Sequence, residues 1–83
     1  MKGIAYSKSA LKTLLLMPAN DASRIRSKVE QYAADPADLA NNAKALVGSP
    51  YIRLRIGDWR VILDDRGQVL GVLKIGPRGG VYE

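Results

Sequence analysis

The feature that most constrains the fold is a run of alternating side chains from residue 51 to residue 63. Apolar residues alternate with arginines up to the pair Gly57-Asp58, and a largely apolar stretch follows that pair. Alternation with a period of two is typical of a β-strand with two different faces. A Gly-Asp pair between two such strands is suited to a two-residue hairpin loop. The sequence therefore predicts an antiparallel hairpin that turns at Gly57-Asp58.

The predicted register sorts the hairpin residues onto two faces, because a two-residue loop fixes which residues lie opposite each other. The apolar face pairs Ile56 with Trp59, Leu54 with Val61, and Ile52 with Leu63. On the other face Arg55 lies opposite Arg60, with Arg53 on the diagonal. Like charges directly opposite each other destabilise a sheet. We therefore interpret this face as a binding surface for an anionic partner.

Composition narrows the chemistry that the chain can perform. The 83 residues are enough for one domain, expected over residues 1–83, and they include neither cysteine nor histidine. Disulfides and thiolate metal sites are excluded, and the usual base near neutral pH is absent. The pair Asp64-Asp65 is predicted to form a turn rather than a metal site, because neighbouring strand residues point to opposite faces. We expect neither a metal nor another cofactor.

Hydropathy predicts a protein without a membrane partner. The longest run of large apolar residues, 14–17, is far too short to span a bilayer. Residues 1–6 lack the apolar centre of a signal peptide. A cytoplasmic location is expected, and the formal net charge of +5 favours an acidic partner there.

A short strand and a helix are predicted at the start of the chain. Residues 2–6 carry alternating apolar side chains. Ser7 is suited to the N-cap of a helix that runs to about Leu16. Pro18 ends this helix, because a proline cannot donate a main-chain hydrogen bond.

A second helix is predicted to begin at Asn20 or Asp21 and to end before the pair Asp35-Pro36. Its apolar residues recur at helical spacing and predict a face that packs on a core. Arg24 and Lys28 lie on the opposite face, which we interpret as a solvated surface.

The second half of the chain is predicted to be a sheet. Residues 37–50 form a mixed segment, residues 65–68 a turn, and residues 69–75 a central strand that is buried on both faces because it is nearly all apolar. The order of a strand, a two-helix hairpin and a three-stranded antiparallel meander predicts an α+β fold with the helices packed on one sheet.

Cations and aromatic rings gather at the predicted hairpin face. The three arginines of the hairpin share it, and Arg78 follows the neighbouring strand. Guanidinium groups bind phosphate through paired hydrogen bonds and stay charged at physiological pH. Tyr51 and Tyr82 add rings that can stack on bases, a combination that suits single-stranded RNA. The alternative is that the arginines form surface ion pairs with Asp58, Asp64 and Asp65.

These positions match a family pattern. Residues 46–62 read Leu-Val-Gly-Ser-Pro-Tyr-Ile-Arg-Leu-Arg-Ile-Gly-Asp-Trp-Arg-Val-Ile, and are followed by Val72-Leu73-Lys74-Ile75-Gly76-Pro77-Arg78 and Val81-Tyr82. The family pattern is a glycine, then Tyr-Arg-Leu-Arg-Val-Gly-Asp-Tyr-Arg-Val, a strand ending in Gly-His-Arg or Gly-Lys-Arg, and Val-Tyr. Over nearly its whole length, the chain resembles the RelE branch of the RelE/ParE toxin superfamily.

The resemblance implies a toxin of a type II toxin–antitoxin system. The implied activity is metal-free cleavage of messenger RNA in the ribosomal A site, in which the ribose 2′-hydroxyl attacks the adjacent phosphate. The catalytic residues implied by position are Arg53, Arg60, Arg78 and Tyr82. RNA contacts are expected from Tyr51, Arg55 and Lys74.

Each implied catalytic residue has a role. Arg53 matches a basic residue near the 2′-hydroxyl, Arg60 the arginine that neutralises the transition-state phosphate, and Arg78 the arginine near the leaving oxygen. Tyr82 matches the tyrosine that stacks on the nucleotide. Well-studied members carry lysine at the positions of Tyr51 and Arg53. Because arginine is a poor proton acceptor, Arg53 is expected to act through its charge. The general base that accepts the 2′-hydroxyl proton is then either Tyr51 or Tyr82.

The resemblance also implies partners. These are a cognate antitoxin protein in a toxin–antitoxin hetero-oligomer, the ribosome and messenger RNA. Two other functions fit the same scaffold. One is a ParE-like toxin that inhibits DNA gyrase without nuclease activity, and the other is a toxin-derived binding module that has lost activity.

Overall fold

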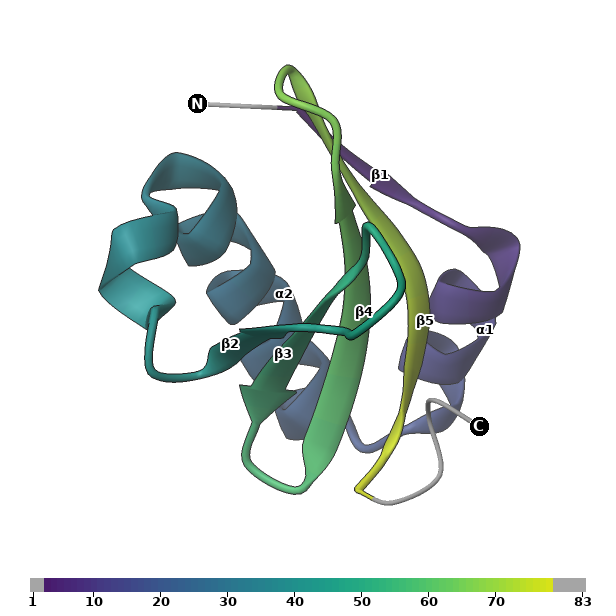
Figure 1. Cartoon of the computed structure of the whole chain (residues 1–83). Helices are drawn as coiled ribbons and strands as arrows, with labels where there is room; N and C mark the ends of the chain where they lie inside the picture. Colours follow the sequence, from purple (N-terminus) through teal and green to yellow (C-terminus); the bar gives the residue numbers. More distant parts are fainter. Residues whose placement is uncertain (1–2, 79–83) are drawn as a thin grey trace.

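A computed structural model describes residues 3–78 of the chain. Its elements are β1 (Gly3–Tyr6), α1 (Lys8–Leu16), α2 (Ala19–Ala34), the 3₁₀-helix η1 (Pro36–Leu39), β2 (Ala43–Ala45), β3 (Ile52–Ile56), β4 (Trp59–Asp65) and β5 (Val69–Pro77). The strands form one sheet in the spatial order β1-β5-β4-β3-β2, with both helices on the same side of it (Figure 1). Strand β1 runs parallel to β5, and the other neighbours are antiparallel.

The predicted α+β fold is confirmed, and its core lies between the helices and one face of the sheet. The helices contribute fully buried side chains such as Ala10, Ile25 and Val29. The sheet contributes Leu54, Ile56, Val61, Leu63, Leu70, Val72 and Ile75. No helix within residues 3–78 is both long and apolar enough to cross a membrane.

The hairpin has the predicted register. Ile56 pairs with Trp59, Leu54 with Val61 and Ile52 with Leu63, and Arg55 lies opposite Arg60. Gly57 adopts a φ of 57°, in the left-handed region that other residues rarely occupy. A glycine in the two-residue loop therefore lets the strands pair without backbone strain.

The predicted meander was incomplete, because the sheet has one more strand in the second half of the chain. Strand β2 pairs with β3 through Ala43 opposite Leu54 and Ala45 opposite Ile52. Alanine and lysine have low strand propensity, so the segment Ala-Lys-Ala gives no strand signal in the sequence. Its pairing depends on the neighbouring strand, which supplies the hydrogen-bond partners.

The start of α2 differs from the prediction. Helix α1 is capped as expected, since the Ser7 hydroxyl accepts a hydrogen bond from the N–H of Ala10 at 3.0 Å. Helix α2 begins at Ala19, with Pro18 at the N-cap, so the predicted cap at Asn20 or Asp21 was wrong. Both residues lie in the first turn, where the carboxylate of Asp21 interacts favourably with the helix dipole.

Strand β5 is not buried on both faces, which corrects the prediction for residues 69–75. Val69 and Lys74 are exposed, and the strand that is buried over most of its length is its neighbour β4, in the middle of the sheet. The register between β4 and β5 shifts at Ile62 and Leu63, where Lys74 pairs with Ile62 and Val72 with Leu63. This irregularity changes the alternation of β5, so that Val72 and Ile75 both reach the core.

Candidate nucleic-acid interface

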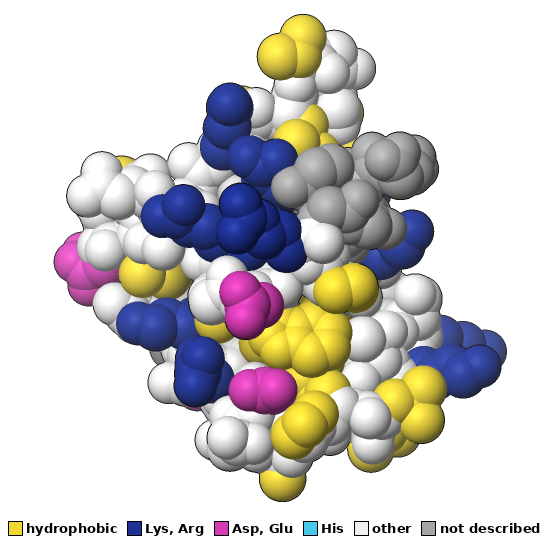
Figure 2. All heavy atoms as spheres, turned by 90° about the horizontal axis from the view of Figure 1, so that it is seen from below, with side chains coloured by type: hydrophobic (Ala, Val, Ile, Leu, Met, Phe, Trp, Pro, Cys, Tyr) yellow, Lys and Arg dark blue, Asp and Glu magenta, His cyan; other side chains and the backbone are white. Residues whose placement is uncertain are grey.

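The face of the sheet that the helices leave uncovered carries a group of basic residues. One row across the strands pairs Lys44 with Arg53, Arg53 with Ile62, and Ile62 with Lys74. The next row pairs Arg55 with Arg60 and Arg60 with Gly76. We call Lys44, Arg53, Arg55, Arg60 and Lys74 the cationic face. Figure 2 shows the molecule from below, at the end where the β3–β4 turn lies, and a dense group of Lys and Arg side chains is visible there.

Arg60 differs from the other members of the cationic face because it is buried, with only 8% of the residue exposed. Its Nη1 donates hydrogen bonds to the carbonyl of Gly57 at 3.0 Å and to the carbonyl of Trp59 at 2.9 Å. Both acceptors belong to the hairpin itself. The turn therefore fixes the orientation of the guanidinium plane, which removes part of the entropy cost of binding a ligand.

Arg78 lies next to the same turn. Its main-chain N–H donates to the carbonyl of Asp58 at 2.8 Å, which holds the residue after β5 against the loop between β3 and β4. The side chain is exposed. The structure thus brings Arg78 to the end of the sheet that carries Arg60, as the predicted site requires. Tyr82, the fourth predicted catalytic residue, lies outside the described residues.

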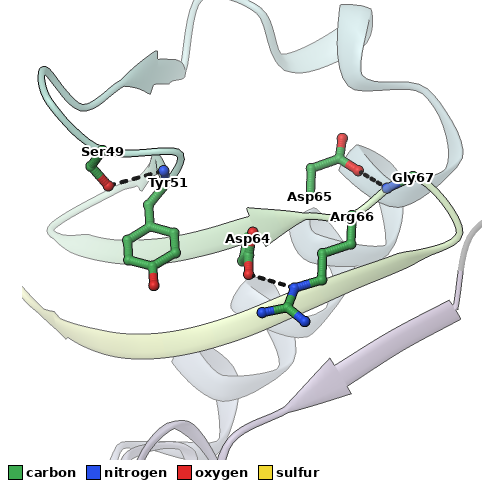
Figure 3. A network of polar contacts seen from close by, with 6 residues as sticks. All are labelled: Ser49, Tyr51, Asp64, Asp65, Arg66 and Gly67. Carbon is green, nitrogen blue, oxygen red and sulfur yellow. Dashed lines mark hydrogen bonds and ion pairs between the residues drawn. The ribbon is translucent and has the colours of Figure 1, made fainter.

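Tyr51 lies at the opposite end of the uncovered face. It precedes β3, and its N–H donates to the Ser49 hydroxyl at 3.0 Å (Figure 3). Four residues along the strand at ~3.3 Å each separate it from Arg55 by about 13 Å. The ring therefore lies with Asp64 and Arg66 rather than with Arg60 (Figure 3). Of the two tyrosines considered as proton acceptors, Tyr51 is distant from the buried arginine.

Asp64 and Asp65, at the end of β4, bind groups other than Arg60. Asp64 accepts a hydrogen bond and ion pair from Arg66 Nε at 2.8 Å, and this bond raises the pKa of Arg66. Asp65 Oδ1 accepts from the N–H of Gly67 at 3.0 Å (Figure 3). Asp64 and Asp65 are the last two residues of β4, so the prediction that this pair forms a turn was wrong. The turn comes directly after them, at residues 66–68. In the part of the chain that the structure describes, no group of His, Cys, Asp or Glu side chains could hold a metal ion.

Two basic residues of the cationic face were hard to place from the sequence. Lys44 joins the face only because β2 pairs with β3, and a single lysine between alanines gives no sign of this. Lys74 was predicted to contact RNA, but simple alternation along β5 would place it on the same side as the buried Leu70 and Val72. The register shift in β5 brings it into the row of Arg53 instead.

Comparisons with solved structures identify similar folds. The chain is similar to RelE in the archaeal RelE–RelB complex from Pyrococcus horikoshii, with 25% identity, a TM-score of 0.78 and coverage of 95% of this chain and 97% of that chain. It is also similar to a chain of the intact Escherichia coli RelBE complex, with 21% identity, a TM-score of 0.71 and coverage of 93% and 96%. The isolated E. coli RelE toxin gives 15% identity, a TM-score of 0.72 and coverage of 94% and 85%.

Sequence comparison gives the family. No match is found among curated proteins. The chain matches the family described as "ParE toxin of type II toxin-antitoxin system, parDE" over residues 4–82. Because this match covers nearly all of the chain and the fold is that of RelE toxins, the chain belongs to the ParE toxin family of type II toxin–antitoxin systems, within the RelE/ParE superfamily and with a RelE-like fold.

Proposed function

We propose that this toxin is a ribosome-dependent endoribonuclease that cleaves messenger RNA in the A site. The observation that carries the proposal is the buried guanidinium of Arg60, held by two carbonyls of its own hairpin and directly opposite Arg55. Preorganised donors in a site of low dielectric stabilise developing charge far better than mobile side chains in water. A cation fixed in this way on a rigid strand is suited to a transition state rather than to general attraction of RNA.

The proposed reaction needs no metal. The ribose 2′-oxygen attacks the adjacent phosphorus and loses its proton, and the bond from phosphorus to the 5′-oxygen breaks. The leaving 5′-oxygen takes up a proton, so the products are a cyclic 2′,3′-phosphate and a 5′-hydroxyl. The reaction passes from substrate to products through a phosphorane, which has additional negative charge on its non-bridging oxygens. The arginines stabilise this charge.

The arginines divide these tasks by position. Nη1 of Arg60 is bound to the turn carbonyls, so the Nε–Nη2 edge is assigned to the non-bridging oxygens, a bidentate geometry that guanidinium favours. Arg53, on the diagonal from Arg60, lies on the side assigned to the 2′-hydroxyl. Arg78, beside the turn, is assigned to the leaving oxygen. Tyr82 is the preferred proton acceptor, because Tyr51 is about 13 Å along the strand from Arg55.

Further contacts extend along the strands. Arg55 and Lys74 are exposed on the cationic face and are assigned to neighbouring phosphates. The ring of Tyr51 is assigned to stacking on a nucleobase of the RNA at the far end of the face. The cognate antitoxin is proposed to cover this surface in a hetero-oligomer, because a chain of net charge +5 favours an acidic partner. RelE is bound to RelB in the solved complexes that the chain resembles.

Cleavage of messenger RNA on programmed ribosomes tests the proposal. The purified toxin should cut the message in the A site, and Arg60→Ala should reduce the single-turnover rate by about 10²–10³, the usual loss when one transition-state donor is removed. Arg66→Ala is the matched control, since it removes the same charge from the other end of the uncovered face and should leave the rate unchanged. An intact message at high toxin concentration would refute the nuclease assignment.

Gyrase inhibition is the second candidate, and the family match itself favours it, because that family is named for ParE. The same preparations are assayed for inhibition of DNA supercoiling by gyrase. Gyrase inhibition with messenger RNA intact would assign the toxin to that target. Inactivity in both assays, in a protein that folds and binds an antitoxin, would indicate a binding module without toxin activity.

A further inference from the structure

A small cleft lies on the helix side of the hairpin turn, next to the cationic face. It has a volume of about 100 Å³ and is bounded by the side of α2, the end of β3 and the turn. Its lining residues are Arg24, Lys28, Leu39, Asn42, Arg55, Ile56 and Gly57. The cleft thus combines basic residues of the helix that the sequence assigned to a solvated surface with one arginine of the cationic face.

The fold brings the basic residues of the cleft together from two elements. Arg24 and Lys28 are four residues apart on α2, a spacing that puts them on one face of the helix. A Cβ atom at Gly57 would lie 3.2 Å from Nη1 of Arg24, so this guanidinium reaches the turn directly. Lys28 is half-buried rather than fully solvated.

The main chain of Arg55 is held in place at the opposite wall of the cleft. Its N–H donates to the carbonyl of Asn42 at 2.8 Å, and the amide nitrogen of Asn42 donates to the carbonyl of Arg55 at 3.3 Å. Arg55 also lines the neighbouring hollow that contains Lys44 and Arg53. Arg55 therefore connects the cleft with the cationic face.

The electrostatics of the cleft favour an anion. Three cations line it, and no carboxylate is among the described residues that do so. Like charges around one small space repel each other, and the apolar side chains of Leu39 and Ile56 lower the local dielectric, which strengthens that repulsion. A bound anion would remove it. The small volume of about 100 Å³ suits a phosphate group rather than a complete nucleotide.

We propose that this cleft binds a backbone phosphate of RNA, distinct from the phosphate that reacts beside Arg60. The proposal rests on the proposed function, because it places the RNA that the toxin acts on across both the cationic face and the turn. Arg24 and Lys28 are then positioning residues, which act on docking and not on the chemical step. The phosphodiester comes either from the message or from ribosomal RNA.

Equilibrium binding tests the cleft without requiring cleavage. The probe is a single-stranded 2′-O-methyl RNA oligonucleotide, which lacks the attacking hydroxyl, and its affinity for the toxin is measured at several salt concentrations. The double variant Arg24→Ala/Lys28→Ala should bind severalfold more weakly. Its slope of log affinity against log salt should fall by about 0.7 for each phosphate of a single strand that the variant no longer neutralises.

The matched control removes two equal charges elsewhere on the helices. Arg26→Ala/Lys12→Ala carries the same net charge, but Arg26 lies over the ring of Tyr6 on another side of α2 and Lys12 is on α1. This control should bind as the parent protein does, apart from a uniform small loss from its lower charge. If both double variants bind equally, attraction by net charge is the whole effect and the cleft proposal is overturned.

Two further measurements make the result decisive. Arg24→Gln/Lys28→Gln, with larger polar replacements, repeats the test if the alanine variant unfolds at a lower temperature than the control. Binding to ribosomal small subunits without message identifies the RNA that supplies the phosphate. If the cleft variant binds these subunits more weakly, the phosphate belongs to ribosomal RNA. If only binding to the oligonucleotide is weaker, the phosphate belongs to the message. A toxin that cleaves nothing but still shows the difference would refute the proposed function and retain the cleft.

Discussion

The two faces of the sheet are formed by alternate residues of the same strands, but one face packs in the core and the other carries cations. On the covered face Leu54 is fully buried against the helices. Its neighbours in β3, Arg53 and Arg55, lie on the uncovered face in rows with other cations. Because a strand alternates its side chains with a period of two, core residues and members of the cationic face are neighbours in the sequence.

Arg60 is an exception to this division between the two faces. It lies on the uncovered face, opposite Arg55, but it is buried and bound to the turn carbonyls. In the proposed function, the hairpin turn is therefore both a structural element and the support for the guanidinium that binds the reacting phosphate. The comparison of the two faces therefore yields a graded set of predictions for stability, in which the covered face contributes most and Arg60 is the exception on the uncovered face.

The largest effect is expected for Leu54→Ala. Removing a fully buried leucine from a core should lower the free energy of unfolding by about 2–5 kcal/mol, a large part of the ~5–15 kcal/mol typical of small domains. Arg55→Ala, the adjacent residue on the other face, should change it by no more than about 0.5 kcal/mol. Urea unfolding followed by circular dichroism measures both. Equal losses would show that the uncovered face is as important for stability as the core.

Arg60→Ala should have the next largest effect on stability. The side chain makes two charge-assisted hydrogen bonds to main-chain carbonyls, so its loss should lower the free energy of unfolding by about 1–3 kcal/mol. Arg60→Lys keeps the charge but loses the planar fork, and it should recover stability only in part. A variant as stable as the parent protein would mean that the turn does not depend on this guanidinium.

Gly57→Ala should be somewhat less destabilising and should separate two causes. The positive φ of 57° costs a residue with a side chain roughly 1–2 kcal/mol. The added methyl group also meets Nη1 of Arg24 at 3.2 Å. In an Arg24→Ala background the same substitution should cost less, because only the backbone term remains. A double-mutant cycle of unfolding free energies measures the difference, and strict additivity would show that Arg24 moves away freely.

Much of the fold could be predicted because local patterns and tertiary contacts agree. The hairpin register follows from alternation and from Gly57-Asp58 alone, and the Ser7 cap follows from its hydroxyl. Strand β2 could not be predicted, since Ala43–Ala45 has no propensity of its own and pairs only because β3 is present. The parallel pairing of β1 with β5 likewise depends on contacts distant in sequence.

The candidate site shows the same limit. Arg53, Arg55 and Arg60 were placed on one face correctly, because the turn fixes their register. The burial of Arg60 and its bonds to Gly57 and Trp59 could not be foreseen, because they depend on a side-chain conformation and not on spacing. The catalytic roles of these arginines stay predictions.

The smallest effect is expected for Tyr6→Phe. Tyr6 lies at the edge of the covered face, where it is only half-buried. Burial raises the pKa of its phenol above the ordinary value of 10.0; Glu30 raises it further, and the nearby guanidinium of Arg26, 5.4 Å from the ring centre, lowers it. Below about pH 10 the phenol is neutral in both the folded and the unfolded chain. Above that pH the unfolded chain loses the proton first, so the free energy of unfolding decreases until the folded chain also titrates.

Tyr6→Phe removes this titration. Urea unfolding of the parent protein and of Tyr6→Phe between pH 8 and pH 11 should therefore show a difference in stability that is constant up to about pH 10 and then moves in favour of the variant as the pH rises. All other ionisable groups are common to the two proteins, so their contributions cancel in the difference. A difference that stays constant to pH 11 would mean that Tyr6 is as well solvated as in the unfolded chain, and that the covered face ends before it.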